Sequence, residues 1–291
     1  MPRSVFRPRP PRHRPSFRLA AALMLVLAIA IGRPPSAFAS EVIVAGVGAA
    51  LDLVHELARR FADDHPDIAV TILPDVACNT SIKALQQADI NIAITACPLP
   101  AAEWDHPLIA IEWLRTPVVL AVSARSRLDN VSSDELIAIY SGSRRQWSDG
   151  NPIRLVLRPP ADPDTGSLQS LVPALSTAIE SAGRRPGMLI ALKDEEVSDL
   201  LATVPGAISP TTLGLINARH REIKPLSLNG VAPTLENQER GLYRLMRTVY
   251  LVTRAQPTWA AAEFFSFLRS SQHRKLFEAS GFVPVTLNLR D

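Results

Sequence analysis

The apolar positions of residues 42–95 follow two different periods along the chain. Runs rich in β-branched residues predict three strands at 42–45, 68–73 and 90–95. Between the first two strands, apolar residues recur at helical spacing from Leu51 to Ala62, and Pro66 ends the pattern. Between the second and third, Thr80 and Ser81 precede a short segment of helical spacing, which predicts a helix with a hydroxyl cap. This order of elements is typical of a parallel α/β sheet.

A second group of elements is predicted from residue 117 onward. Apolar runs predict strands at 117–122, 153–158, 206–209, 223–228 and 250–252. Helical spacing predicts helices at 128–140, from about 168, at 259–268 and at 272–279, and residues 131–133 are the expected N-cap region of the first. The segment 159–167, which separates a predicted strand from a predicted helix, is polar and rich in proline, so we interpret it as a loop.

The first 39 residues differ in pattern from everything that follows. Residues 1–18 contain six arginines and no acidic residue, and an apolar run of 13 residues extends from Leu19 to Ile31. With the small-residue triplet Ala37-Phe38-Ala39 after it, this order is typical of a cleavable secretory signal peptide. A membrane-spanning helix needs about 20 apolar residues, so a retained anchor is the weaker alternative. We therefore expect export to the periplasm.

Removal of this leader reverses the sign of the net charge. The whole chain carries 31 basic and 28 acidic residues, for a net charge of +3. Seven arginines lie in residues 1–39, so 24 basic residues remain against 28 acidic ones, a net charge of −4. The basic character belongs to the leader, and no nucleic-acid partner is expected. The remaining 252 residues are enough for two lobes of about 100–150 residues each, and we expect a monomer.

The only two cysteines, Cys78 and Cys97, lie close to the ends of predicted strands. An exported protein meets an oxidising compartment, in which a pair of cysteines can form a disulfide. We therefore favour a disulfide between them, and two buried thiols are the alternative.

Three predicted strand-to-helix loops share a feature that suits anion binding. Each places small or hydroxyl residues at a helix start, and the candidates are Ala49, Ala50, Leu51, Thr80, Ser81, Thr165, Gly166 and Ser167. Helix N-termini carry unpaired N–H groups and a partial positive charge. Arg158 would add a charged fork, and Thr95 a further hydroxyl. Because ligands of open α/β sheets bind at the carboxyl ends of strands, these groups predict a site for a small oxyanion.

Other chemistries have less support in the sequence. The six histidines form no H-x-x-x-H pattern, so no metal is expected. The chain has no P-loop, no G-x-G-x-x-G run and no G-x-S-x-G elbow, so neither a nucleotide cofactor nor hydrolase activity is expected. The arginine-rich segment 240–254 is interpreted as a crossover strand with solvated arginines, with binding of an anionic partner as the alternative. We expect a binding protein without a cofactor, not an enzyme.

Several stretches resemble the substrate-binding proteins of phosphate ABC transporters. They are Leu136–Gly142, Gln146–Ile153 with its W-x-D-G-x-P-I pattern, Arg158 with Asp162, Asp164-Thr165 and Leu168, and the closing Phe264–Ser270 and Gly281–Pro284. The resemblance implies a type II periplasmic binding protein fold: α/β and two-lobed, each lobe a mainly parallel sheet flanked by helices, joined by two crossover strands. It also implies phosphate as the ligand and an inner-membrane ABC permease as the partner.

The sequence departs from that family at positions that matter for the ligand. Family members carry a hydroxyl residue near Ala49-Ala50, and an aspartate at the position of Ala96 that accepts the proton of hydrogen phosphate. Their R-x-x-x-S-G-T arrangement is replaced by a longer loop that ends in Thr165-Gly166-Ser167. An exported sensor or interaction module of the same fold, with a changed or degenerate anion site, is therefore the alternative function.

Together these observations predict a signal peptide at 1–39 and two lobes. Residues 41–120 and 246–291 form the first lobe, and residues 121–245 form the second, with hinges near 118–122 and 245–250. A small oxyanion, with phosphate favoured, would lie between the lobes and stabilise their closed state for delivery to an ABC importer.

Overall fold

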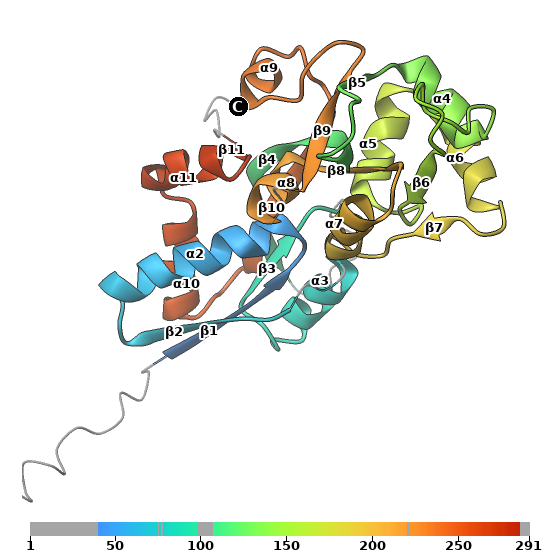
Figure 1. Ribbon diagram of the computed structural model, residues 1–291. Coiled ribbons are helices and arrows are strands. Elements are labelled where there is room, and N and C mark those ends of the chain that lie inside the picture. Colours follow the sequence, from blue (N-terminus) through green and yellow to red (C-terminus); the bar gives the residue numbers. More distant parts are fainter. Residues whose placement is uncertain (1–39, 75, 77, 98–106, 220–221, 286–291) are drawn as a thin grey trace, which may run out of the picture. The chain divides into compact units, whose positions relative to one another are not determined.

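The computed structural model describes residues 40–285 except 75, 77, 98–106 and 220–221. The predicted signal peptide, residues 1–39, lies outside the described residues. From Ser40 onward the chain forms one compact unit of strands and helices (Figure 1). Within the described residues, none of the helices has the length and apolar character needed to cross a membrane.

The elements follow one another in an α/β order. The strands are β1 (Ser40–Gly46), β2 (Ile68–Ile72), β3 (Ile92–Thr95), β4 (Leu108–Ser123), β5 (Asn130–Val131), β6 (Arg154–Leu157), β7 (Leu189–Ile190), β8 (Ala207–Thr212), β9 (Ile223–Leu228), β10 (Met246–Arg254) and β11 (Val283–Pro284). The helices are α2 (Ala49–Asp64), α3 (Cys78–Gln86), α4 (Ser133–Ser141), α5 (Pro163–Leu171), α6 (Leu175–Gly183), α7 (Asp194–Thr203), α8 (Leu213–Arg219), α9 (Leu235–Glu239), α10 (Trp259–Leu268) and α11 (Arg274–Ala279), with a 3-10 turn at Ser271–His273.

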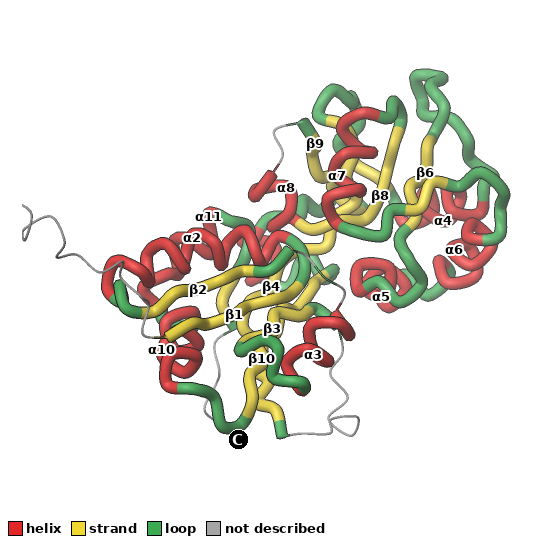
Figure 2. Tube along the Cα trace, turned by 90° about the horizontal axis from the view of Figure 1, so that it is seen from below, coloured by secondary structure: helices red, strands yellow, loops and turns green. Residues whose placement is uncertain are grey.

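Two groups of parallel strands are connected by antiparallel ones. The strands run in the order β2-β1-β3-β10-β4-β8-β6-β7, and β1 is parallel to β2 and β3, as β6 is to β7 and β8. β4 belongs to both groups, because its first part pairs antiparallel with β10 and its last part pairs with β8 and β9. Figure 2 shows β1, β2 and β3 well away from β6 and β8. The strand predicted at 117–122 is thus the second part of a much longer strand.

Each group of strands has its own hydrophobic core. The first core packs α2, α10 and α11 around β1 and β3, with Phe61, Phe264 and Phe277 fully buried. The second is built from residues 118–245 and includes Tyr140 and Leu168. Burying a large apolar side chain contributes about 1.5–3 kcal/mol, so each lobe is stabilised by its own core. The predicted two-lobed α/β fold is confirmed, and its boundaries at residues 120 and 246 stay a prediction.

Two helices begin at different residues than predicted, whereas a third begins at its predicted cap. The N-cap region expected at residues 131–133 is confirmed, because α4 begins at Ser133. The Ser132 Oγ accepts from the Glu135 N–H and the Glu135 carboxylate accepts from the Ser132 N–H, which is a capping box. α3 begins at Cys78, so Thr80 and Ser81 lie inside the helix and do not cap it.

α5 likewise begins earlier than predicted, at Pro163 and not near Leu168. The Asp162 side chain accepts from the N–H groups of Asp164 and Thr165, and Pro163 occupies the first turn, where the missing N–H costs nothing. The expectation of a loop that extends to residue 167 is therefore wrong, and residues 165–167 belong to the first turns of a helix.

Candidate ligand-binding cleft

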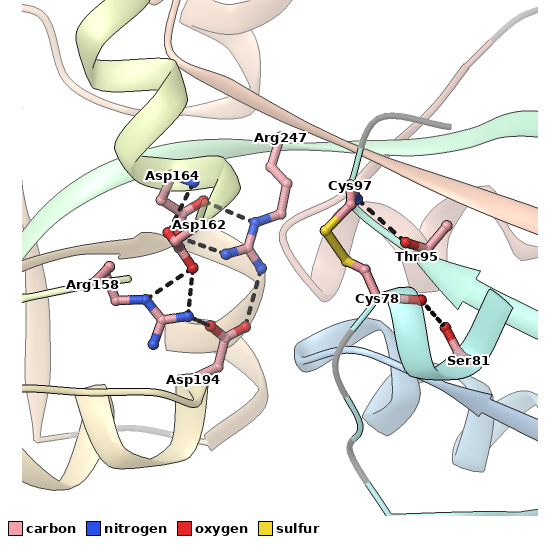
Figure 3. The surroundings of a disulfide bond; sticks show 9 residues. All are labelled: Cys78, Ser81, Thr95, Cys97, Arg158, Asp162, Asp164, Asp194 and Arg247. Atoms are coloured by element: carbon pink, nitrogen blue, oxygen red, sulfur yellow. Dashed lines mark hydrogen bonds and ion pairs between the residues drawn. A yellow bond between two sulfur atoms is a disulfide. The ribbon is translucent and has the colours of Figure 1, made fainter. Parts of the chain in front are cut away.

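Two buried arginines and three aspartates form one ion-pair network. Its members are Arg158, directly after β6; Asp162 and Asp164, at the start of α5; Asp194, the first residue of α7; and Arg247, in β10. All five side chains are at least nine-tenths buried. Figure 3 shows the two guanidinium groups facing one another across the aspartates.

Arg158 is held by two of the carboxylates and one backbone carbonyl. Its Nε and Nη2 donate to Asp162 Oδ2 at 3.0 and 2.7 Å, and Nη1 donates to the carbonyl of Ala191 at 3.3 Å. Nη2 also donates to Asp194 Oδ1 at 2.9 Å. Charge-assisted bonds of this kind are about twice as strong as neutral ones, so the fork is fixed in position.

Arg247 reaches the same network from β10. Its Nε and Nη2 donate to the two oxygens of Asp164 at 2.8 and 2.6 Å, a bidentate pair. Its Nη1 donates to Asp194 Oδ2 at 3.0 Å. The Asp194 carboxylate therefore bridges the two arginines, with one oxygen on each guanidinium.

The Asp194 carboxylate also lies against the start of α2. Gly48 precedes that helix at a φ of 58°, and a Cβ at this position would overlap Asp194 Oδ2. No side chain caps α2. Because a helix N-terminus carries a partial positive charge, the helix start and the two guanidinium groups favour a negative charge at the same place.

The network holds one more acidic group than basic ones, which affects its titration. Burial raises the pKa of Asp164 to about 7; Arg247 opposes this shift, and the charges of Asp162 and Asp194 add to it. Burial also disfavours the charge on Arg247, but the three aspartates outweigh that effect and raise its pKa. The guanidinium groups therefore stay charged.

The opposite wall of the cleft carries a disulfide, and its described lining residues, which include Val76, Cys78, Asn79, Ala96 and Cys97, are uncharged. Cys78, at the start of α3, is bonded to Cys97, just after β3, with 6.0 Å between their Cα atoms. Ser81 Oγ donates to the Cys78 carbonyl at 2.8 Å, and Thr95 Oγ1 accepts from the Cys97 N–H at 3.3 Å (Figure 3). The disulfide favoured from the sequence is present in the structure.

A cavity of about 380 Å³ lies between these two walls. Its lining residues include Gly48, Val76, Cys78, Asn79, Ala96, Cys97, Arg158, Asp162, Pro163, Leu192, Lys193, Asp194 and Arg247. The starts of four helices, α2, α3, α5 and α7, thus meet at one cleft. The volume lies at the lower end of the range of about 300–1,000 Å³ typical of small-molecule sites.

The cavity is lined by residues at the predicted helix starts and by Arg158. The remaining predicted ligand residues are not among its lining residues: Ala49, Ala50, Leu51, Thr80, Ser81, Thr95, Thr165, Gly166 and Ser167. Most are buried, whereas Thr80 is exposed on α3. Their roles as ligand donors stay a prediction.

Several of these candidates already have partners within the protein. Ser167 Oγ donates to the carbonyls of Pro163 and Met246 at 3.0 Å each. The Thr165 N–H donates to Asp162 Oδ1 at 3.3 Å, and the Gly166 N–H to the Asp162 carbonyl at 3.1 Å. At the start of α5, a carboxylate of the chain itself occupies the helix N–H groups that were expected to hold the ligand.

Four residues that line the cavity were not predicted from the sequence: Asn79, Lys193, Asp194 and Arg247. Segment 240–254 was interpreted as a strand with solvated arginines, but Arg247 is only 6% exposed, so for this residue the interpretation is wrong. The signal was available: Arg247 has the same strand parity as Val249 and Leu251, which are both buried. Asp194 gave no such signal, because acidic residues are ordinary in the first turn of a helix.

Two α/β lobes and a cleft lined by the starts of helices are typical of proteins that bind a small ligand between their lobes. Residues 33–272 match the sequence model described as the PBP superfamily domain, so the chain belongs to the PBP superfamily. The Phosphate-binding protein PstS of Bacillus subtilis (strain 168) is 23% identical over 255 residues, which cover 84% of this chain and 80% of that protein.

Two solved structures share the fold. A putative phosphate ABC transporter substrate-binding protein with bound phosphate, from Clostridium perfringens, has a TM-score of 0.72 and 17% identity, and covers 84% of this chain and 100% of its own. An ABC-type phosphate transport receptor from Vibrio cholerae has a TM-score of 0.60 and 19% identity, and covers 83% of this chain and 99% of its own. The fold that the family resemblance implied is confirmed.

Proposed function

We propose that this chain is an exported solute-binding protein that captures a small oxyanion, with phosphate favoured, in the cleft between its lobes. The observation that carries the proposal is the convergence of Arg158, Arg247 and the starts of α2 and α3 on one cavity. Guanidinium forks and helix N-termini are the groups that proteins use for oxyanions. Phosphate is favoured because the relatives named above bind or transport it.

The capture involves no covalent chemistry. An oxyanion that contacts both guanidinium groups touches residues of both predicted lobes, since Arg158 belongs to the second and Arg247 to the first. A ligand that binds both lobes stabilises the closed state over the open one. The closed form would then deliver its ligand to an inner-membrane ABC permease, and export through the signal peptide at 1–39 would bring the protein to the periplasm.

Isothermal titration calorimetry of the purified protein with phosphate, sulfate, molybdate and small organic anions tests the proposal. We expect phosphate to bind, and Arg158→Lys to weaken binding because an ammonium cannot replace the planar guanidinium that holds Asp162 and at the same time faces the cavity. Arg184→Ala, which removes an exposed arginine of the same lobe that pairs with Glu180, should leave the affinity unchanged. If no anion in the series binds, the proposal is wrong.

A second candidate function has a specific observation in its favour. The two guanidinium groups of the cleft are already paired with three carboxylates, and the family's aspartate is replaced by Ala96. Such a cleft would suit an exported sensor or interaction module with a degenerate anion site. This candidate predicts that no anion in the calorimetric series binds.

A further inference from the structure

One carboxylate of the chain occupies the place that suits an oxyanion ligand best. Asp194 Oδ1 accepts from Arg158 Nη2 at 2.9 Å, and Oδ2 accepts from Arg247 Nη1 at 3.0 Å. Oδ2 also lies where a Cβ of Gly48 would stand, at the start of α2. Two guanidinium groups and a helix N-terminus thus surround a single carboxylate that lines the cavity.

We propose that Asp194 is an internal ligand of the cleft, which an incoming oxyanion displaces from Arg158 and Arg247, so that this competition sets the affinity of the protein. The inference rests on the proposed capture of an oxyanion and adds the residue that regulates it. When Asp194 leaves, one N–H of Arg158 Nη2 and one of Arg247 Nη1 become available on either side of the same point.

The other two aspartates of the network have structural roles away from the cavity or at a helix cap. Asp162 Oδ2 accepts two bonds from Arg158 while its Oδ1 caps α5, so both oxygens have structural tasks. Asp164 is fully buried, lies outside the residues that line the cavity, and holds Arg247 with both oxygens. Asp194 is the carboxylate of the network that combines a place on the cavity wall with a single guanidinium bond per oxygen.

The charges of the network support exchange at Asp194. With Asp194 in place, three carboxylates face two guanidinium groups, and the excess negative charge repels an external anion. Without it, Arg158 keeps Asp162 and Arg247 keeps Asp164. The pairing then becomes one to one, so a protein that lacks the Asp194 charge should still fold.

An internal ligand lowers the apparent affinity by the fraction of molecules in which the site is open. If Asp194 is displaced in about one molecule in ten, removing its charge should lower the Kd by about tenfold. The gain should be similar for phosphate and for sulfate, because a competitor blocks any oxyanion that uses the same two guanidinium groups.

The test is calorimetry of the full protein and of Asp194→Asn with phosphate and with sulfate. An asparagine keeps the size of the side chain, but its amide nitrogen cannot accept from a guanidinium, so the bridge is broken. Asp199→Asn is the matched control, because Asp199 is exposed on the same helix and carries the same charge. We expect Asp194→Asn to bind both anions about tenfold or more tightly than the natural protein, and Asp199→Asn to bind like it. A denaturation curve for each variant establishes that it is folded.

The possible outcomes separate this inference from the proposed function. If the natural protein binds phosphate and Asp194→Asn binds it equally or more weakly, capture stands and the internal ligand is refuted. A loss confined to phosphate would give Asp194 the role of proton acceptor instead. If only Asp194→Asn binds, the internal ligand stands, and capture by the natural protein fails. If neither binds any anion, both ideas fail together.

Discussion

The two walls of the cleft are held in place by different interactions. Side-chain ion pairs fix the geometry of one wall. They join Arg158, Asp162, Asp164 and Asp194 with Arg247 from β10. The opposite wall has no charged group among these contacts, and a disulfide and side-chain to backbone bonds fix it. Figure 3 shows the two arrangements side by side.

This difference separates the part of the cleft that can exchange partners from the part that cannot. An ion pair can be replaced by another ion of the same sign, so the charged wall can bind an anion at the expense of an internal contact. A disulfide in an oxidising compartment has no such alternative. We therefore expect the charged wall to determine binding and the disulfide wall to provide a fixed surface opposite it.

The largest loss of stability is expected when Arg247 is removed from the charged wall. Arg247→Ala leaves the fully buried Asp164 without its bidentate partner. Removing one partner of a buried ion pair typically costs about 3–5 kcal/mol, and we expect a loss of this size in the free energy of unfolding, measured with urea. Arg240→Ala, at an exposed pair with Glu236, should cost less than about 1 kcal/mol. Equal losses in the two variants would show that the buried Arg247–Asp164 pair contributes no more to stability than an exposed pair.

The disulfide wall is tested by the double variant Cys78→Ser, Cys97→Ser. The two cysteines are separated by 19 residues, and closing a loop of that length stabilises a protein by about 3 kcal/mol according to the chain-entropy estimate. We expect the free energy of unfolding to fall by about this amount, and a reducing agent to have the same effect on the natural protein but none on the variant. An unchanged urea midpoint would mean that the disulfide does not stabilise this wall.

The pH dependence of stability should come from the charged wall. Burial raises the pKa of Asp164 from 3.8 to about 7 in the folded protein, so the folded state holds a proton that the unfolded state has lost. This contribution to stability is fully present below about pH 4 and is lost as the pH rises through about 7. Unfolding curves between pH 4 and 8 should show this decline in the natural protein and in Asp199→Asn, and a smaller decline in Asp164→Asn. A decline of the same size in Asp164→Asn would assign it to another group.

The fold was largely predictable, because its elements have strong local signals. The helix at 259–268 coincides with α10, whose aromatic residues pack at helical spacing. The strand at 223–228 coincides with β9. α6 and α7, between residues 175 and 203, were not predicted. The buried residues of α6, Leu175, Ala178 and Ala182, do lie at helical spacing, but two of the three are small, so the apolar signal is weaker than that of the aromatic residues of α10.

The site was predictable only in part, because burial of charge leaves little trace in a sequence. Arg158 and the helix starts were identified from a local pattern of strand, small residues and helix. Asp162 lies only four positions from Arg158. The pair of Arg158 with Asp194 and the pair of Arg247 with Asp164 join residues that are 36 and 83 positions apart, so they depend on tertiary structure. Nothing near Asp194 in the sequence indicates that its side chain would meet two guanidinium groups.

A crystal structure of the protein grown with phosphate would test the central claim most directly. The account predicts a phosphate whose oxygens accept from Arg158 Nη2 and Arg247 Nη1, with the Asp194 carboxylate moved away from both. A phosphate bound in the cleft while Asp194 still bridges the two arginines would contradict it.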